Sequence, residues 1–438
     1  MPAAATGRRL FGTDGVRGVA GEFLTAEVAL RLGRAATLTL PAEHPQVLIV
    51  RDTRESGAML EAALAAGIAA GGGHALLGGV LPTPGASVLV RRYRFDMAAV
   101  VSASHNPYPD NGIKFFGPEG MKVSDGQEAE IERRLDEPST RIGRLRALHG
   151  AARDYLRELE VRFASLDLSG LRVLLDCANG ATYRVAPEIF RRLGADVEAI
   201  AGEPDGRNIN EGVGSTNIDA LAERLDGHDL AFAFDGDGDR VLALDRNGTV
   251  VDGDELMALA ALHLRGEGRL AGDGVAVTVM TNYGFHRAME AAGIEVATTN
   301  VGDRYVLAEL LRRGWALGGE QSGHIIDAGF VPSGDGTAAA LLALEALAGS
   351  DLADRHAMEK LPQRLVNVRV RDLTALDGAD AVWAAVERES DALRGRGRVL
   401  VRRSGTEPLV RVMVEAPGDA ECEEIAGRLA NLVEAELG

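Results

Sequence analysis

One pattern of apolar and polar positions occurs three times along the chain. Each time, a run of β-branched and other apolar residues is followed by a polar turn and by an alanine-rich stretch that ends in glycine. The runs open as VLIVRDTRESG from Val47, VLLDCANG from Val173 and VAVTVMTNYG from Val275. Near-continuous apolar runs that alternate with helical stretches indicate parallel strands covered by helices on both faces. The pattern predicts three related α/β domains with mixed, mainly parallel sheets.

Each of these units continues with a second short strand and then with a third strand that runs into a polar loop. The three loops are VVSASHNPYPDNG after Ala99, AFDGDGDR after Phe232 and LGGEQSGH after Ala316. Because parallel sheets place ligands at the carboxyl ends of their strands, we expect the loops to occupy equivalent positions and to carry the chemistry.

After about residue 365 the pattern changes to VNVRVRDL, a helix near Trp383, VLVRRSGTEPLVRVMVEA and a C-terminal helix, which predicts a smaller α+β domain. The charged stretch 128–157 is interpreted as solvated helices and a turn. We place the four domains at residues 1–155, 156–255, 256–365 and 366–438.

Composition and charge exclude several classes of protein. The formal net charge of −18 argues against a nucleic acid or an anionic membrane as partner, because a phosphate backbone selects for a basic face. The N-terminal MPAAATGRRLFG has no apolar signal core, and no uncharged apolar run approaches the roughly 18 residues of a membrane span. Cys177 and Cys422 lie outside any metal-ligand spacing and are interpreted as reduced thiols. We expect a cytoplasmic protein.

The DGDGDR loop is a candidate metal site. Asp235, Asp237 and Asp239 alternate with glycines, so that three carboxylates can turn to one side of a tight loop. Hard oxygen ligands favour Mg²⁺ or Ca²⁺. An EF-hand is excluded, because the sixth position is Arg240 and not glycine, and the twelfth is Arg246 and not glutamate. An acidic surface turn is the alternative interpretation.

In the SASHNP loop, Ser104 is a candidate nucleophile, phosphate carrier or turn former, since serine favours turns by bonding its own backbone. Lys114 follows in the same segment, and lysine occurs only three times among the 47 basic residues. Arginine cannot give up its proton, whereas a lysine can be tuned to act as an acid or a base. An ordinary surface cation is the alternative for Lys114.

Three further segments combine glycine with groups suited to a sugar phosphate. In GGEQSGH, the alternating Glu320, Ser322 and His324 can face one ligand. FGTDGVRG sets Arg17 among glycines that would let it reach a phosphate. RRSGTEPLVR has the parts of a phosphate-anchoring loop. Plain turns, and for the last segment a salt-bridged hairpin with Glu407 and Glu415, are the alternatives.

In chain order, FGTDGVRG, SASHNP, DGDGDR, GGEQSGH and RRSGTEP resemble the motifs of the α-D-phosphohexomutase superfamily, over nearly the whole chain. The resemblance implies four domains arranged around a central cleft, to which each domain contributes one loop. It also implies an isomerase that moves a phosphoryl group within a sugar by way of an enzyme phosphoserine.

The resemblance further implies a role for individual residues. Ser104 would be the phosphoserine, and Asp235, Asp237 and Asp239 would hold one Mg²⁺ together with an oxygen of Ser104. The positions used near proton transfer and near the phosphoserine are Lys114, His324 and Arg17. The substrate-binding positions are His105, Arg240, Glu320, Ser322 and, for the non-reacting phosphate, Arg402, Ser404, Gly405, Thr406 and Arg411.

The substrate is indicated by two segments. VGDRYV after Asn300, and GEQSGH where the phosphomannomutase and phosphoglucomutase branches have GEMSGH, are similar to the branch that acts on glucosamine phosphate. This implies interconversion of glucosamine 6-phosphate and glucosamine 1-phosphate through glucosamine 1,6-bisphosphate, supplying UDP-N-acetylglucosamine for cell-wall synthesis. Asp303 could attract the amino group or pair with Arg304.

Two other functions stay open at this point. One is a mutase of broad specificity for glucose and mannose phosphates, and the other is a sugar-phosphate-binding protein without activity. A homodimer is the candidate assembly.

Overall fold

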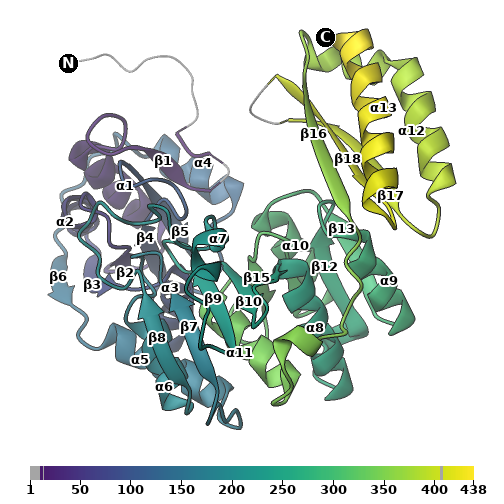
Figure 1. The fold of residues 1–438 in the computed structure, drawn as a ribbon. Coiled ribbons are helices and arrows are strands. Elements are labelled where there is room, and N and C mark those ends of the chain that lie inside the picture. The colour runs from purple at the N-terminus through teal and green to yellow at the C-terminus, as the bar shows by residue number, and fades with distance from the viewer. Residues whose placement is uncertain (1–9, 13, 405–407) are drawn as a thin grey trace. The chain divides into compact units, whose positions relative to one another are not determined.

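The computed structural model describes residues 10–12, 14–404 and 408–438. They form two units (Figure 1). The first unit comprises the chain up to Val279 together with Ala297–Arg355, and the second comprises Met280–Val296 together with His356–Gly438.

The first sheet has six strands in the order β1-β5-β4-β2-β3-β6. Its strands are β1 (Val16–Val19), β2 (Gln46–Arg51), β3 (His74–Val80), β4 (Met97–Val101), β5 (Asp110–Phe116) and β6 (Arg144–Ala147). β2 is parallel to β3 and β4, and β3 is parallel to β6, whereas β5 is antiparallel to β1 and β4. The sheet is therefore mixed.

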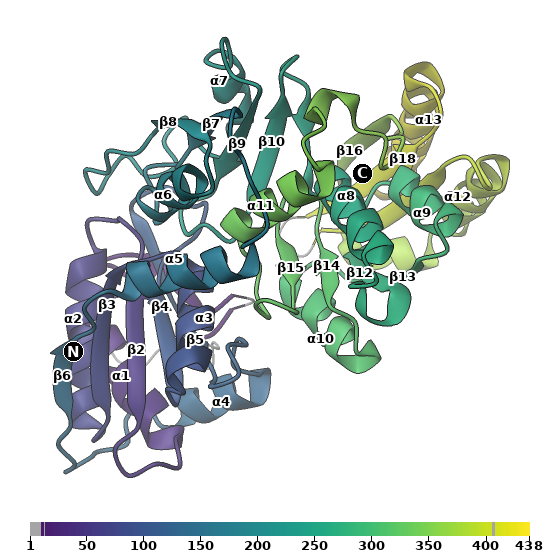
Figure 2. The same cartoon turned by 90° about the horizontal axis from the view of Figure 1, so that it is seen from below.

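Helices cover both faces of this sheet (Figure 2). They are α1 (Ala26–Thr39), α2 (Gly57–Ala70), α3 (Thr83–Tyr93), α4 (Asp125–Arg133) and α5 (Ala151–Arg162). The backbones of α1 and α2 approach closely, because a Cβ atom on Gly33 would lie 2.3 Å from the Leu64 carbonyl oxygen and one on Gly67 would lie 2.0 Å from that of Leu30. The glycines in these alanine-rich helices therefore serve helix packing.

The second sheet has the order β11-β10-β9-β7-β8. Its elements are β7 (Arg172–Asp176), α6 (Val185–Arg192), β8 (Asp196–Ile200), α7 (Ile218–Ala222), β9 (Leu230–Phe234), β10 (Val241–Asp245) and β11 (Val250–Val251). β7 is parallel to β8 and β9, and β10 is antiparallel to β9 and β11. The DGDGDR loop is the connection between β9 and β10.

The third sheet has the order β13-β12-β14-β15, with β12 parallel to β14 and β14 antiparallel to β15. In chain order, the elements of this segment are α8 (Gly253–Gly266), η1 (Ala271–Asp273), β12 (Gly274–Thr278), α9 (Tyr283–Ala291), β13 (Glu295–Thr299), α10 (Asp303–Arg313), β14 (Leu317–Gly319), β15 (Ile325–Asp327), α11 (Gly336–Leu347) and η2 (Leu352–Asp354). The GGEQSGH loop joins β14 to β15.

The second unit contains α9 and the C-terminal domain. That domain has an antiparallel sheet, β16-β18-β17, with η3 and two helices. Its elements are β16 (Gln363–Arg369), η3 (Leu373–Gly378), α12 (Asp380–Ala392), β17 (Arg398–Arg403), β18 (Leu409–Glu415) and α13 (Asp419–Leu437). Asn282 and Leu361 exchange two hydrogen bonds of 3.0 Å, which fixes the start of α9 to this domain.

The predicted class, three α/β domains with mixed sheets and a smaller α+β domain, is confirmed by these sheets. The central cleft and the boundaries at residues 155, 255 and 365 stay predictions. One expectation was wrong: within the stretch 128–157, Arg144–Ala147 forms the edge strand β6. All four of its residues are exposed, so no buried apolar face marked it as a strand. Among the described residues, no helix is both long and apolar enough for a membrane crossing.

A buried pair joins α5 to the start of α11. The Tyr155 hydroxyl donates to both carboxylate oxygens of Asp335 at 2.9 Å, and Asp335 caps α11 by accepting the Ala338 amide at 2.9 Å. Burial raises the pKa of Asp335 to about 6. Because the folded pKa lies above the unfolded value, the contribution of Asp335 to stability is complete below about pH 4 and is lost as the pH rises through about 6.

The variant Asp335→Asn should therefore change the pH dependence of stability. Asparagine keeps an oxygen for the cap but carries no charge at any pH. Between about pH 4.5 and about pH 7.5 the variant should gain stability relative to the wild type, by about 2 kcal/mol. Thermal unfolding midpoints of both proteins at the two pH values test this. A constant difference in Tm would contradict the assignment.

Candidate active site and metal centre

Ser104 lies in the loop between β4 and β5 and is almost fully buried, with 2% of its surface exposed. Its backbone has a φ of 53°, a left-handed conformation that serine rarely adopts. The hydroxyl donates a hydrogen bond to Asp235 Oδ2 at 2.5 Å and lies 3.3 Å from His105 Nδ1. The loop of domain I and the loop of domain II therefore meet at this hydroxyl group.

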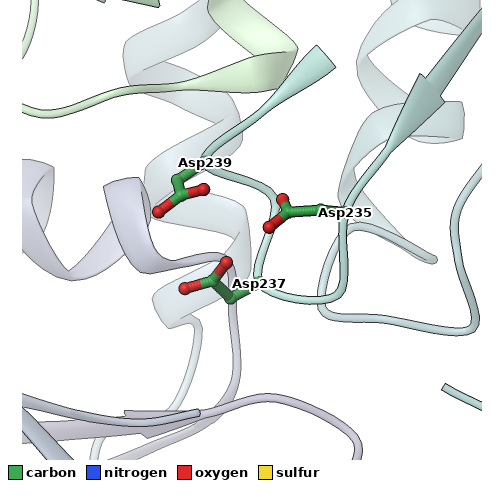
Figure 3. A group of neighbouring side chains, drawn as sticks. All are labelled: Asp235, Asp237 and Asp239. Atoms are coloured by element: carbon green, nitrogen blue, oxygen red, sulfur yellow. The ribbon is translucent and has the colours of Figure 1, made fainter. Parts of the chain in front are cut away.

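Asp235, Asp237 and Asp239 turn toward one another in the β9–β10 loop (Figure 3). All three are buried, and each offers a carboxylate oxygen within 4.8 Å of the others. Gly236 is required for a close approach, because a Cβ atom there would lie 2.6 Å from the Ser104 carbonyl oxygen. The loop is thus built for the contact between the two domains.

The electrostatics of these carboxylates favour a cation. Burial, and then Asp239 and Asp237, raise the pKa of Asp235 well above its usual range. Burial opposes ionisation of Asp237 too, but Lys114 and the Thr83 hydroxyl outweigh it and lower the pKa of Asp237. One buried oxygen of Asp237 and one of Asp239 accept no hydrogen bond. Hard oxygen atoms that accept no hydrogen bond, in a cluster of carboxylates, fit a divalent cation, so this is a candidate metal site.

Lys114 reaches this cluster from β5. Its Nζ atom lies 3.1 Å from Asp237 Oδ2 and 3.0 Å from Asp14 Oδ2, and only 1% of the residue is exposed. Lys114 is therefore not an ordinary surface cation. Burial alone would lower the pKa of Lys114, but the Asp14 and Asp237 carboxylates outweigh burial and raise it. Without a bound cation, the site keeps this lysine protonated.

Arg17 contacts the loop that carries Ser104 and His105. The Arg17 guanidinium pairs with Asp14 and donates to the Ala103 carbonyl oxygen at 3.5 Å. Burial, together with Arg240 and Arg17, lowers the pKa of His105, so the imidazole is neutral at pH 7.

Asp303 and His324 bring the third domain to the site. His324 Nε2 lies 3.9 Å from Asp239 Oδ2 and 3.7 Å from Asp303 Oδ2. Asp303 also accepts a hydrogen bond from Lys122 at 2.5 Å, and Lys122 donates to Asp14 at 2.5 Å. The side chain of Arg304 pairs with Asp125 instead. Of the two alternatives for Asp303, the ion pair with Arg304 is wrong, because the Asp303 carboxylate pairs with Lys122 of domain I.

Lys122 was not among the predicted site residues. The rarity of lysine in this chain was the signal that could have found it, because both lysines of domain I contact Asp14. A lysine placed between carboxylates of two domains links the FGTDGVRG segment to the VGDRYV segment.

The remaining predicted residues of domains II and III also lie in these loops. The Arg240 amide donates to Asp235 Oδ1 at 3.2 Å, and its guanidinium Nε lies 3.8 Å from Asp239 Oδ1. Arg240 also forms a β-bridge with His324. Glu320 accepts a hydrogen bond from the Gly302 amide at 3.0 Å, and Ser322 is exposed.

In the second unit, Arg402 and Arg411 face each other across β17 and β18. Arg411 donates to the Ser404 hydroxyl at 3.4 Å, and burial together with Arg411 lowers the pKa of Arg402. Two neighbouring guanidinium groups beside a hydroxyl are suited to an anion. Glu415 pairs with Arg398. Gly405 and Thr406, with Glu407, lie outside the described residues.

Four family models match the chain, in the order of the domains. Residues 8–141 match domain I of phosphoglucomutase/phosphomannomutase, residues 153–248 match domain II, residues 252–365 match domain III and residues 365–432 match the C-terminal domain. The chain therefore belongs to the phosphoglucomutase/phosphomannomutase family, the phosphohexomutases.

Within that family, similar curated relatives are phosphoglucosamine mutases. The chain is 49% identical to the phosphoglucosamine mutase of Pelotomaculum thermopropionicum, over 97% of this chain and 98% of the relative. It is 46% identical to that of Bacillus subtilis, over 98% and 99%. Both comparisons span nearly the whole of each protein.

Solved structures share the fold. A phosphoglucomutase/phosphomannomutase family protein from Burkholderia thailandensis superposes with a TM-score of 0.84 at 24% identity, covering 98% of this chain and 97% of that one. An N-acetylphosphoglucosamine mutase from Aspergillus fumigatus, solved with GlcNAc-6P and magnesium, gives a TM-score of 0.70 at 18% identity, covering 98% and 96%.

Proposed function

We propose that this chain is a magnesium-dependent phosphoglucosamine mutase that interconverts glucosamine 6-phosphate and glucosamine 1-phosphate through a phosphoserine at Ser104. The observation that carries the reaction type is the Ser104 hydroxyl, which is held 2.5 Å from Asp235 in a cluster of three buried carboxylates. The choice of substrate is supported by the identity of 46 to 49% with curated phosphoglucosamine mutases over nearly the full length.

The proposed reaction consists of two opposite transfers. First, the Ser104 Oγ–P bond breaks, a bond from phosphorus to the O1 atom of glucosamine 6-phosphate forms, and the O1 hydroxyl gives up its proton. The bisphosphate then presents its other end, and the 6-phosphoryl group returns to Ser104 while O6 takes up a proton. Phosphate and proton balance over the cycle, and glucosamine 1-phosphate leaves.

The carboxylates of Asp235, Asp237 and Asp239, with an oxygen at Ser104, would hold one Mg²⁺. When bound, the ion supplies Lewis-acid stabilisation of the negative charge on the transferring phosphoryl group. The oxygens of Asp237 and Asp239 that accept no hydrogen bond support this assignment. We propose that Lys114 and His324 exchange the sugar proton and that Arg17 orients the phosphoryl group.

Further residues are proposed to bind the sugar phosphate. The residues assigned to the sugar and the transferring phosphate are His105, Arg240, Glu320 and Ser322. Those assigned to the non-reacting phosphate are Arg402, Ser404, Gly405, Thr406 and Arg411. Because Asp303 already pairs with Lys122, we assign the amino group to Glu320 rather than to Asp303. We further propose a cytoplasmic enzyme, with a homodimer as its candidate assembly, that acts on this small molecule without a nucleic acid or membrane partner.

Labelled phosphate tests the proposal. Protein phosphorylated at Ser104 with ³²P should transfer the label to glucosamine 6-phosphate in the presence of Mg²⁺, and the sugar phosphate should isomerise. Label that stays on the protein while the sugar isomerises would contradict a phosphoserine route.

The variant Lys114→Arg should be strongly impaired although it keeps the charge. Lys114 is almost fully buried between Asp14 and Asp237, where the larger guanidinium does not fit without displacing a carboxylate, and arginine cannot release a proton. We expect kcat to fall by roughly 10²-fold or more. The exposed Lys360 provides the control, and Lys360→Arg should be unchanged. Near-normal turnover of Lys114→Arg would show that only charge matters there.

A further inference from the structure

Arg54 lies in the turn between β2 and α2, and its guanidinium group is buried beneath the Ser104 loop. The residue is 1% exposed. Its Nε donates to Asp52 Oδ2 at 2.8 Å, Nη1 donates to the carbonyl oxygens of Pro107 at 2.5 Å and Asp110 at 2.9 Å, and Nη2 donates to those of Ser104 and Asn106 at 2.8 Å. A guanidinium has five N–H groups, and all five are used.

Asp52 links the same arginine to the other side of Ser104. The Asp52 carboxylate accepts a hydrogen bond from the Ser102 hydroxyl at 2.5 Å as well as from Arg54. The Ser102 hydroxyl in turn accepts the Ser104 amide at 3.0 Å. The amide and the carbonyl of Ser104 are therefore both fixed through one buried ion pair.

Domain II holds the same loop through a second side chain. The Asn210 side-chain amide donates to the carbonyl oxygens of Ser104 at 2.9 Å and Asn106 at 3.1 Å, which are the two acceptors of Arg54 Nη2. Ser104 is kept at its φ of 53° with its hydroxyl directed at Asp235. A serine in this sparsely populated conformation has to be held by its surroundings.

We infer that Arg54 is a positioning residue for phosphoryl transfer, with Asn210 as its counterpart from domain II, an inference that rests on the proposed function. Transfer to and from one hydroxyl requires attacking and leaving oxygen atoms to lie in line, and Arg54 sets where that hydroxyl lies. Every hydrogen bond of the Arg54 side chain goes to the protein. Replacement of Arg54 should therefore lower kcat and leave the KM for the sugar phosphate unchanged.

The test uses the full-length protein with Arg54→Lys. Lysine keeps a positive charge beside Asp52, but a single ammonium cannot reach four carbonyl oxygens spread along the loop. We expect kcat to fall on the order of 10²-fold, with KM within about twofold of the wild type. Arg207 is exposed and pairs with Glu55, the residue that follows Arg54 in the sequence. Arg207→Lys is therefore the matched control.

A second variant covers the case in which Arg54→Lys does not fold. Asn210 has a φ of 59°, so Asn210→Gly removes the amide group without backbone strain. We expect about a tenfold lower kcat at unchanged KM. Mass spectrometry after incubation with glucosamine 1,6-bisphosphate should show slower phosphorylation of Ser104 in both variants, measured on folded protein.

The possible results separate the inference from the proposed function. If the wild type neither accepts phosphate at Ser104 nor isomerises glucosamine 6-phosphate, the proposed function fails and this inference fails with it. If the wild type is active and folded Arg54→Lys or Asn210→Gly keeps its kcat, only the inference is overturned. A rise in KM at constant kcat would also overturn it, because that result would assign the residue to substrate binding.

Discussion

Replacing Ser104 with alanine should lower the mutase kcat by on the order of 10⁴-fold or more, because the proposed reaction has no other group to carry the phosphoryl between substrate molecules. The hydroxyl is buried and donates one hydrogen bond, to Asp235, so its removal takes away the carrier and little else. Alanine is smaller than serine and fits the same space, and it has to adopt the same backbone φ as Ser104. The variant should fold and should take up no phosphate from glucosamine 1,6-bisphosphate.

The control for Ser104→Ala is the same substitution at a serine outside the proposed site. Ser165 is exposed, and Ser165→Ala should retain full activity. Residual turnover of Ser104→Ala above a few thousandths of the wild-type value, with intact folding by circular dichroism, would contradict the phosphoserine assignment.

Asp239→Asn should produce the second large loss. Asp237 accepts hydrogen bonds from Lys114 and Thr83, and Asp235 accepts one from Ser104. Among the described residues, Asp239 has only the longer contacts with Arg240 at 3.8 Å and with His324 at 3.9 Å. The change at Asp239 therefore isolates the metal-ligand role best. If the cluster holds the ion that neutralises the phosphoryl charge, kcat should fall by roughly 10²- to 10⁴-fold, and more Mg²⁺ should be needed for half-maximal activity.

Chelation and pH give independent measures of the same ion. EDTA should abolish the activity of the wild type, and excess Mg²⁺ should restore it. Because burial and the neighbouring carboxylates raise the pKa of Asp235, protons compete with the ion and the apparent Mg²⁺ affinity should increase with pH. Asp196 is exposed, so Asp196→Asn is the control for the variant Asp239→Asn. Full activity in EDTA would contradict a metal-dependent reaction.

Much of the fold could be predicted because its signals are local. The strands from Val47, Val173 and Val275 are buried on both faces, so each appears as a continuous apolar run. The DGDGDR loop could also be predicted, because the alternation of aspartate with glycine is visible in five successive residues. The edge strand Arg144–Ala147 was not, since it is exposed and pairs with one neighbour only.

The parts that could not be predicted depend on contacts between distant segments. In the sequence, Arg54 belongs to the segment that opens at Val47 and carries no sign of its contacts. The folded chain brings its guanidinium group under residues 104–110. The contact of Lys122 with Asp303 spans two domains in the same way. The pKa of Lys114 is raised by two carboxylates that come from separate loops. The sequence around Lys114 therefore does not show whether this pKa is raised or lowered.

The most direct test of the account is a comparison of substrates. Turnover of glucosamine 6-phosphate should be measured beside that of glucose 1-phosphate and mannose 1-phosphate, each with Mg²⁺ and a trace of the matching bisphosphate. A kcat/KM at least about tenfold higher for the amino sugar, or about 1.4 kcal/mol of transition-state discrimination, is the result that the account predicts. Equal or better turnover of the neutral hexose phosphates would contradict it and would identify a mutase of broad specificity.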